Sequence, residues 1–342
     1  MVSRFFYHRG TEGVYATRKS FVEKKMILIT GGAGFIGSHV ALRLQELGHE
    51  TVVLDDLSYG DRRAVLEGAF VQGDIGDASL LEQIFKDYPI AAVFHFAAYI
   101  DVGESVAHPE KYYKNNVEKT GVLLESVAKH GVENFIFSST AAVYGNPHEN
   151  KIAETHPTFP INPYGESKLL AEKLLADFKD IRSISLRYFN AAGGDPKKRL
   201  KNFKKKESNL IPAALHSLVN GGSLTIFGED YATPDGTCIR DYIHVWDLAE
   251  AHILALHALQ KGASSNVFNL GNGQGYSVKQ VLKSVEDVTN KKLNIINGPR
   301  RPGDPPVLVA DAAKAFHQFH WRPQFPALNS IVSDAWAGLC LP

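Results

Sequence analysis

A glycine cluster directly after the first apolar run constrains the fold of this chain more than any other feature. Gly31, Gly34 and Gly37 form the pattern G-x-x-G-x-x-G between the apolar run 26–29 and a helix-like stretch over 35–47. Glycines at these positions permit a tight turn, a close approach of backbone to a pyrophosphate and close packing of helix on strand. The pattern therefore predicts a strand, an anion-binding turn and a helix, which together open a dinucleotide-binding fold.

A carboxylate at the end of the next strand-like run indicates which dinucleotide binds. Asp55 follows the run 51–54, where it can accept a hydrogen bond from an adenosine ribose hydroxyl. Because it would repel a 2′-phosphate, it favours NAD over NADP. The position of Asp74 alone fits an adenine contact and an ordinary turn aspartate equally well. The residues predicted for this part of the cofactor site are Gly31, Gly34, Phe35, Ile36, Gly37, Asp55, Asp56, Asp74 and Ile75.

Strand-like runs alternate with helical patterns through the first half of the chain. The runs 51–54, 91–96, 134–137 and 183–186 have strand character, and helical patterns lie between most of them. Such alternation implies a parallel sheet covered by helices on both faces. We therefore predict an α/β fold, a Rossmann-type doubly wound sheet with a smaller α/β lobe that binds substrate.

The expected domain boundaries follow from the places where the pattern changes. After residue 188 the sequence loosens into a Gly/Pro/Lys-rich stretch, where the smaller lobe should begin. The predicted divisions are an N-terminal extension over 1–25, an NAD-binding domain over 26–190 and about 240–270, and a substrate-binding lobe over about 191–239 and 271–342.

A candidate catalytic face combines a phenol, an ammonium and a hydroxyl. Tyr164 and Lys168 stand four residues apart at the start of a helical stretch, so their side chains share one face. The ammonium favours the phenolate and would make Tyr164 a usable base near neutral pH, although such a pair is more often merely solvated. Ser138-Ser139-Thr140 ends a strand-like run and places a hydroxyl at the carboxyl edge of the sheet, where ligands bind. Thr140, Tyr164 and Lys168 are therefore the predicted catalytic residues.

These motifs, in this order, are typical of the extended branch of the short-chain dehydrogenase/reductase superfamily, which the chain resembles over residues 26–340. Within that branch it is most similar to the UDP-galactose 4-epimerases. The likeness rests on His95-Phe96-Ala97-Ala98, Val102-Gly103-Glu104-Ser105, Phe137-Ser138-Ser139-Thr140, Leu186-Arg187-Tyr188-Phe189-Asn190 and Arg240-Asp241-Tyr242-Ile243-His244. It implies an NAD-dependent homodimer that epimerises C4 of a UDP-hexose through a transient 4-keto sugar.

The resemblance also implies a role for each matching residue. Thr140 would hydrogen-bond the 4-hydroxyl of the sugar, Tyr164 would take its proton, and Lys168 would lower the tyrosine pKa and hold the nicotinamide ribose. For Asp74, the resemblance favours a contact with adenine over an ordinary turn role. The nicotinamide-side contacts implied are Phe96, Ala97, Ala98, Asn116, Tyr164, Lys168 and Tyr188. The implied substrate contacts are Thr140, Tyr164, Asn190, Asn209, Leu210, Arg240, Arg301, Asp304 and Leu308.

Two arginines suit the diphosphate of such a substrate, because each guanidinium donates two parallel hydrogen bonds in a fixed fork. Surface arginines are the alternative reading, and Arg300 competes with Arg301 for the phosphate. Leu308 stands where similar enzymes place a residue facing C2 of the sugar, and it is expected to disfavour N-acetylated sugars.

The chain departs from the family pattern at two positions. Ile100 replaces the usual lysine after the His-Phe-Ala segment, which removes a positive charge near the cofactor, and Thr140 replaces the usual serine. Tyr99-Ile100 is nearer to epimerases acting on other UDP-sugars, including arabinose-type ones. The sequence therefore leaves the choice of sugar open, and the alternatives to galactose and glucose are arabinose or xylose and an N-acetylhexosamine.

Three other functions fit the sequence less well. A nucleotide-sugar dehydratase needs an acid and a base directly after the threonine, where this chain has Ala141 and Ala142, which cannot move a proton. A non-catalytic nucleotide sensor or scaffold on the same fold would be expected to lose the catalytic triad. A net oxidoreductase would accumulate NADH, whereas an epimerase returns the hydride.

Composition narrows the partners. The 342 residues carry a formal net charge of zero, so no whole-protein field attracts nucleic acid or anionic lipid. The basic run 197–206 has few interleaved aromatics and is expected to be a surface loop rather than a nucleic-acid site. The two cysteines and scattered histidines lack metal-ligand spacing, and no stretch reads as a signal peptide or membrane span. We expect no metal, no membrane contact and a cytoplasmic location.

Overall fold

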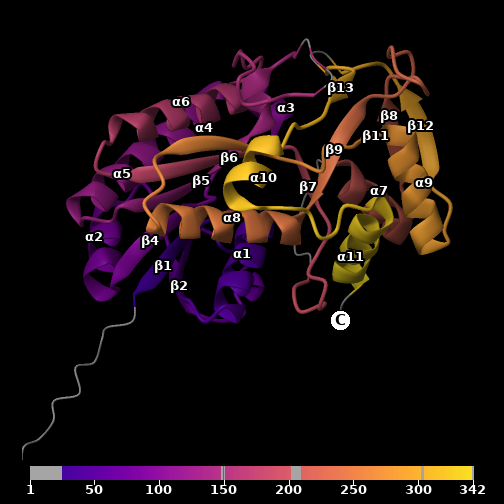
Figure 1. Cartoon of the computed structure of the whole chain (residues 1–342). Helices are drawn as coiled ribbons and strands as arrows, with labels where there is room; N and C mark the ends of the chain where they lie inside the picture. The colour runs from indigo at the N-terminus through magenta and orange to yellow at the C-terminus, as the bar shows by residue number, and fades with distance from the viewer. Residues whose placement is uncertain (1–24, 148, 150, 202–208, 302–303, 341–342) are drawn as a thin grey trace, which may run out of the picture.

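The computed structural model describes residues 25–147, 149, 151–201, 209–301 and 304–340. Its larger lobe is built on a seven-stranded sheet in the order β10-β6-β5-β4-β1-β2-β3, in which every neighbouring pair is parallel (Figure 1). The strands are β1 Met26–Thr30, β2 Glu50–Asp55, β3 Ala69–Gln72, β4 Ile90–His95, β5 Asn134–Thr140, β6 Arg182–Tyr188 and β10 Asn266–Leu270. The strand order reverses between β1 and β4, which is the point where ligands bind in doubly wound sheets.

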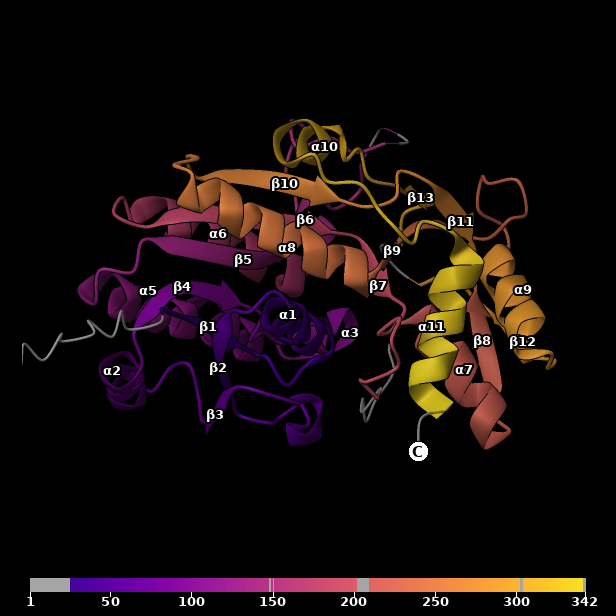
Figure 2. The same cartoon turned by 60° about the horizontal axis from the view of Figure 1, so that its bottom comes forward.

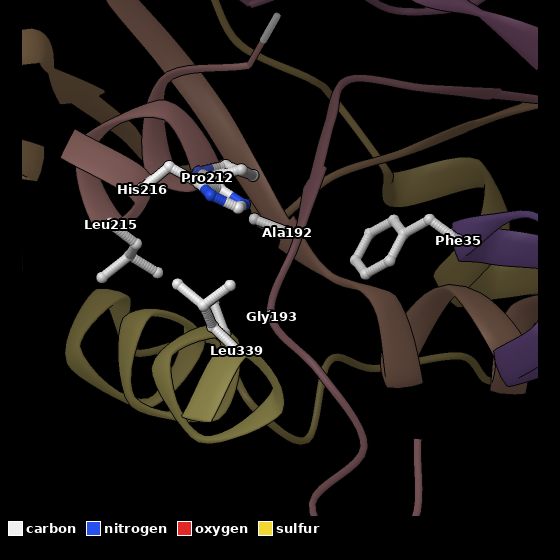
Figure 3. A pocket seen from close by; sticks show the side chains of 8 residues that line it. Phe35, Ala192, Gly193, Pro212, Leu215, His216 and Leu339 are labelled. Atoms are coloured by element: carbon white, nitrogen blue, oxygen red, sulfur yellow. The ribbon is translucent and has the colours of Figure 1, made fainter. Parts of the chain in front are cut away.

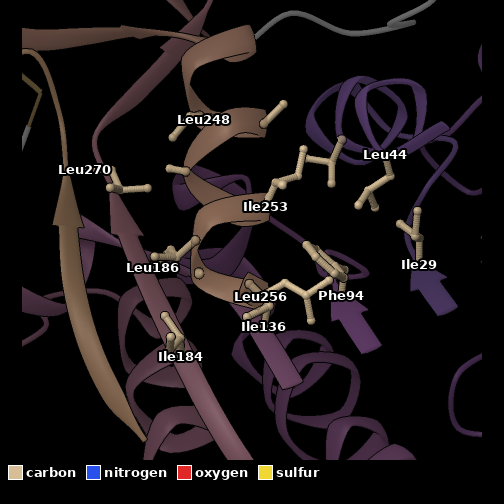
Figure 4. Packing of buried hydrophobic residues seen from close by; sticks show 14 of the residues in the cluster. Ile29, Leu44, Phe94, Ile136, Ile184, Leu186, Leu248, Ile253, Leu256 and Leu270 are labelled. Atoms are coloured by element: carbon tan, nitrogen blue, oxygen red, sulfur yellow. The ribbon is translucent and has the colours of Figure 1, made fainter. Parts of the chain in front are cut away.

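Helices cover both faces of this sheet. Alternate residues of β1 explain why: Ile27 and Ile29 enter one core with α1 (Phe35–Glu46) and α8 (Val245–Gln260), and Leu28 enters the opposite core. Figure 4 shows α8 laid across the first core. The opposite face is covered by α2 Ala78–Asp87, α5 Lys119–Lys129 and α6 Pro163–Asp177. The predicted Rossmann-type α/β fold is confirmed.

The smaller lobe is organised around β9 (Ile239–His244). β9 lies next to the larger lobe and runs directly into α8 (Figure 2). Three short strands pair with β9: β7 Asn190–Ala192, β11 Gly275–Ser277 and β13 Val307–Leu308. The separate pair is β8 Ser223–Phe227 with β12 Asn294–Gly298. A core of its own joins α7 Leu210–Asn220, α9 Val278–Thr289 and α11 Leu328–Cys340.

The chain returns to the larger lobe near its end. α10 (Ala313–Phe319) packs on β10 and α8, and the rings of Phe268 and Phe319 lie 4.2 Å apart. Trp321 is buried in the same core. The range 271–342, expected for the smaller lobe, therefore includes a segment that packs on the large sheet, because its apolar side chains are buried in the core with β10 and α8.

Short helical turns complete the larger lobe. They are η1 Arg62–Ala64, α3 Val102–Ala107, α4 Pro109–Tyr113, the π-helical turn η2 Lys114–Glu118, and η3 Ala141–Tyr144. Within the described ranges, no helix is both long and apolar enough to cross a membrane, and no cluster of His, Cys, Asp or Glu could hold a metal ion. The expected extension 1–25 lies outside the described residues, apart from Lys25.

Candidate active site

The glycine loop between β1 and α1 is built for close backbone approach. Gly31 has φ +71°, and a Cβ there would stand 2.5 Å from the backbone nitrogen of Ala97. A Cβ at Gly37 would stand 2.4 Å from the carbonyl oxygen of Gly31. Gly34 caps α1 without a side-chain hydrogen bond, so the helix start presents backbone N–H groups and a partial positive charge. This cradle fits a pyrophosphate, with Phe35 and Ile36 in the first turn.

Asp55, the last residue of β2, faces this loop. One carboxylate oxygen accepts from Ala33 N at 2.9 Å and the other from Leu57 N at 2.9 Å. Burial raises its pKa despite these bonds. The carboxylate is thus held rigidly with lone pairs left for a ribose hydroxyl. Asp56, the next residue, is exposed.

Asp74 lies farther along the same edge of the sheet. Its carboxylate accepts from Gly76 N at 2.7 Å and forms an ion pair with Lys119. Ile75 is buried beside it. The turn role of Asp74 is therefore present in the structure, and contact with adenine remains a prediction.

The catalytic face begins where α6 begins. The Asn162 side chain accepts from Gly165 N at 2.8 Å, and Pro163 occupies the first helical position, so cap and proline fix the helix start. Tyr164 and Lys168 consequently share the face turned to β5, as predicted. Thr140, the last residue of β5, faces the Tyr164 phenol and acts to lower its pKa.

Lys168 is almost completely enclosed, with 2% of its surface exposed. Its ammonium donates to the carbonyl oxygen of Ser138 at 2.8 Å and lies 4.8 Å from the centre of the Phe137 ring. The Ser138 hydroxyl is hydrogen-bonded to the hydroxyl of Tyr188. The structure therefore brings the three predicted catalytic residues and Tyr188 together at the carboxyl ends of β5 and β6.

Burial dominates the electrostatics of this face. It lowers the pKa of Lys168 to about 7, against the opposing effect of Glu172, and it raises the pKa of Tyr164, against the bond from Thr140. Burial of Tyr164 acts against the phenolate and the contact with Thr140 acts for it, and the phenolate near neutral pH that we expect from the neighbouring ammonium stays a prediction.

Asn116 lies at the centre of the π-helical turn and is buried. Its amide nitrogen donates to Tyr99 O and Ser167 Oγ, both at 3.0 Å, and its oxygen accepts from Tyr99 N at 2.9 Å. The implied nicotinamide contact thus supports the loop after β4 and the first turn of α6. Phe96, at the start of that loop, bonds through its N–H to Thr30 O at 2.9 Å, and Ala97 and Ala98 continue it past Gly31.

The implied diphosphate residues meet in the smaller lobe. Arg240 on β9 donates to Asp304 at 3.0 Å. Arg300 bonds Asp230 at 2.6 Å and stacks on Tyr231. The exposed Arg301 lies with its guanidinium carbon 4.0 Å from the centre of the Phe227 ring and has no carboxylate partner in the part of the chain that the structure describes. Arg301 is therefore the freer of the two for a phosphate.

The other implied substrate residues surround the junction of the lobes. Asn190 begins β7 beside Tyr242, and Leu308 lies beside Arg240 in the β13–β9 register. Leu308 also packs on the cluster of Ala141, Val143, Tyr144, Ile152 and Leu169 next to the catalytic face. Asn209 is the N-cap of α7, and Leu210 is the first residue of that helix.

The comparisons with known proteins decide the family. The model of the NAD dependent epimerase/dehydratase family matches residues 27–271. The chain belongs to this family. A UDP-glucose 4-epimerase of Halalkalibacterium halodurans is 48% identical over 314 residues, which are 91% of this chain and 94% of the relative.

Solved structures of similar enzymes superpose closely on this family member. The UDP-glucose 4-epimerase of Brucella ovis in complex with NAD has a TM-score of 0.89 and 43% identity, over 91% of this chain and 97% of that one. The UDP-glucose-4-epimerase of Stenotrophomonas maltophila, with bound NAD and formylated UDP-arabinopyranose, has a TM-score of 0.87 and 38% identity, over 91% and 97%. The predicted family and its NAD dependence are confirmed.

A hollow separates the glycine loop of this epimerase-family chain from the smaller lobe (Figure 3). Phe35 faces it from the larger lobe, and residues of α7 and α11 face it from the other side. The predicted catalytic residues Thr140, Tyr164 and Lys168 do not line it, so the hollow lies between the lobes and apart from the predicted reacting centre. Its lining residues are Phe35, Ala192, Gly193, Pro212, Leu215, His216, Ala335 and Leu339.

Sequence reasoning missed several residues of this site. The guanidinium of Arg301 stacks on the ring of Phe227. Tyr231 lies buried among Arg240, Arg300 and Asp304. Neither lies in a motif, and only the fold brings them to the arginines. Glu172, by contrast, follows Lys168 by four residues, and this spacing could have placed it on the catalytic face.

The basic run is partly described, and two of its described cations are paired with carboxylates. Lys197 bonds Glu46 at 2.6 Å, and Arg199 bonds Glu46 at 2.5 Å and Asp195 at 2.7 Å. Arg199 also lies over Trp246. These pairs anchor the start of the run to the larger lobe and leave less charge for a nucleic acid; residues 202–206 lie outside the described part.

Proposed function

We propose that this chain interconverts UDP-galactose and UDP-glucose by NAD-dependent epimerisation at C4. The observation that carries the proposal is the cluster of Thr140, Tyr164 and Lys168 at the carboxyl ends of β5 and β6. It stands at the same end of the sheet as the glycine loop, as a sugar bound beside a dinucleotide requires.

In this proposal Thr140 holds the 4-hydroxyl of the sugar and Tyr164 removes its proton. The charge of Lys168 favours the phenolate form of Tyr164, which accepts this proton and becomes a phenol, and Tyr164 returns the proton after the 4-keto sugar has turned over in its pocket. NAD supplies the acceptor and later the donor of the hydride from C4. Proton and hydride are both restored, so the reaction has no net oxidation.

The cofactor is assigned to the glycine loop and the strand ends beside it. Gly31, Gly34 and Gly37 would admit the pyrophosphate at the start of α1, and Asp55 would accept from the adenosine ribose. The other proposed cofactor contacts are Phe35, Ile36, Asp56, Asp74, Ile75, Phe96, Ala97, Ala98, Asn116, Tyr164, Lys168 and Tyr188.

The UDP moiety is assigned to the smaller lobe. Arg240 and Arg301 would bind the diphosphate, and Asp304 orients Arg240. Asn190, Asn209 and Leu210 would contact the nucleotide, and Leu308 would line the sugar pocket. A different UDP-sugar is the second candidate, because one structural neighbour binds a formylated UDP-arabinopyranose and Tyr99-Ile100 departs from the glucose-type pattern.

Two competing activities fit the site less well. Dehydration lacks its acid and base, since Ala141 and Ala142 follow Thr140 in η3. A sensor or scaffold would have no use for an enclosed lysine beside a hydrogen-bonded tyrosine. We further propose a cytoplasmic homodimer: both cysteines are free, and apolar Val102, Val106 and Phe159 are exposed near α3 and α6.

The experiment is to incubate the purified chain separately with UDP-galactose, UDP-N-acetylgalactosamine and UDP-arabinopyranose, and to resolve the products by anion-exchange chromatography. UDP-glucose should form fastest. Faster conversion of either other sugar would move the assignment to that substrate, and no conversion of any would remove the proposed activity.

A further inference from the structure

One buried carboxylate on the catalytic face has no part in the reaction proposed above. Glu172 lies one helical turn after Lys168 on α6, with 7% of its side chain exposed. Oε1 accepts from Ser139 Oγ at 2.5 Å and from Arg187 Nε at 2.9 Å, and Oε2 accepts from Arg187 Nη2 at 2.5 Å. Both carboxylate oxygens are therefore bound, and the pair is closed to solvent.

These bonds join three elements at the reacting centre. Ser139 precedes Thr140 on β5, and Arg187 precedes Tyr188 on β6; the two are cross-strand partners in the sheet. Tyr164, Lys168 and Glu172 occupy three successive turns of α6 and meet three consecutive residues of β5: Tyr164 faces Thr140, Lys168 bonds the carbonyl of Ser138, and Glu172 bonds the hydroxyl of Ser139. Removing Glu172 would release the last of these attachments.

Further hydrogen bonds hold the Glu172–Arg187 ion pair in place. Arg187 Nη1 donates to the Tyr144 hydroxyl at 3.0 Å, and that hydroxyl donates to Asn269 Oδ1 at 2.7 Å. Asn269 is fully buried and donates to Ile152 O at 2.8 Å. A buried ion pair anchored on every side keeps one geometry, and burial without such partners would be costly.

Among the charged and titratable groups around Lys168, Glu172 is the anion that acts on it. Tyr164 shares its helix, and His95 on β4 is kept neutral by burial, which lowers its pKa to about 3. Tyr188 on β6 is bonded to Ser138, and Arg187 reaches only Glu172 and Tyr144. The carboxylate of Glu172 opposes the effect of burial on Lys168.

We propose that Glu172 is a positioning residue for the epimerisation that acts through Lys168: bound by Ser139 and Arg187, it holds the Lys168 turn of α6 against β5 and supplies the charge that keeps Lys168 an ammonium. The inference rests on the proposed function. It assigns Ser139 and Arg187 to the support of the catalytic face rather than to the binding of substrate.

The test compares Glu172→Gln with Glu166→Gln, the same change at an exposed position of the same helix. Wild-type activity on UDP-galactose is measured first, because its absence would refute the proposed function rather than this inference. Glu172→Gln should lower kcat about tenfold or more with little change in KM. The alkaline limb of kcat/KM should move to lower pH by about one unit, since Lys168 loses its nearest anion. Glu166→Gln should match the wild type.

A double-mutant cycle separates this role from a merely structural one. In a Lys168→Met background, Glu172→Gln should cost less than about twofold, because the residue through which it acts is gone. If Glu172→Gln does not fold, as judged by its melting curve, Ser139→Ala keeps the ion pair and should give a smaller shift in the same direction. An unshifted pH profile in the folded variant, or the same loss with and without Lys168, would overturn the proposal.

Discussion

Gly31→Ala tests how the glycine loop is built, and Gly48→Ala is its matched control. Both glycines have positive φ, +71° and +82°, so both substitutions impose the same left-handed strain of about 1 kcal/mol. A Cβ at Gly48 meets nothing within 4 Å, whereas a Cβ at Gly31 meets three backbone atoms of Phe96 and Ala97 at 2.5–2.8 Å.

The extra loss at Gly31 can be worked from those distances. Carbon atoms in contact prefer about 3.5–4 Å, so the 96–97 segment must move by about 1 Å. Overpacking of this kind costs about 1–3 kcal/mol. Gly31→Ala should therefore lower the free energy of unfolding by about 2–4 kcal/mol, and Gly48→Ala by about 1 kcal/mol or less, because alanine also restricts the unfolded chain.

The assay is denaturant unfolding of both variants, with and without added NAD, together with NAD affinity by calorimetry. The segment that must move borders the proposed nicotinamide site, so only Gly31→Ala should lose NAD affinity, by tenfold or more. Equal destabilisation of the two variants, or undiminished NAD affinity in Gly31→Ala, would refute the close approach described here.

Three further predictions concern cofactor, sugar and pH. Nucleotide released by heat should be NAD or NADH, and Asp55→Asn should narrow the preference over NADP; release of NADP from the wild type would contradict the role of Asp55. Leu308→Ser should raise turnover of UDP-N-acetylglucosamine, and Leu308→Tyr should leave turnover of UDP-galactose unchanged. If the unmodified enzyme already processes both sugars equally, Leu308 does not determine sugar specificity. Burial raises the pKa of Asp241 to about 6 from the usual 3.8, so its contribution to stability is complete below pH 3.8 and is lost as pH rises through 6, by about 3 kcal/mol. Unfolding from pH 4 to 7 should show a flatter pH dependence in Asp241→Asn, and parallel curves would disprove this.

The parts of the site that depend on local spacing could be predicted from the sequence. The glycine loop needs only its own turn, and Tyr164 and Lys168 need only one helix, so pattern and spacing place them. The ends of the strands were harder to predict. The expected run 134–137 continues as β5 to Thr140, because pairing with β6 extends past the last pair with β4.

The parts that depend on tertiary packing could not be predicted in the same way. Ser139, Glu172 and Arg187 are far apart in sequence and meet only because β5, β6 and α6 pack together. The return of α10 to the large sheet likewise depends on tertiary contacts, with β10 and α8. The pKa of Tyr164 depends on enclosure, which spacing does not reveal.

The most direct measurement of the central claim incubates UDP-galactose with the wild-type enzyme and, separately, with Tyr164→Phe. The products are resolved by chromatography, and NADH is followed by its absorbance. The account predicts UDP-glucose without net accumulation of NADH, and a rate lower by about 10²–10⁴-fold in Tyr164→Phe, because acid–base catalysis at O4 is lost. Near-normal turnover by Tyr164→Phe, or NADH formed in proportion to product, would contradict it.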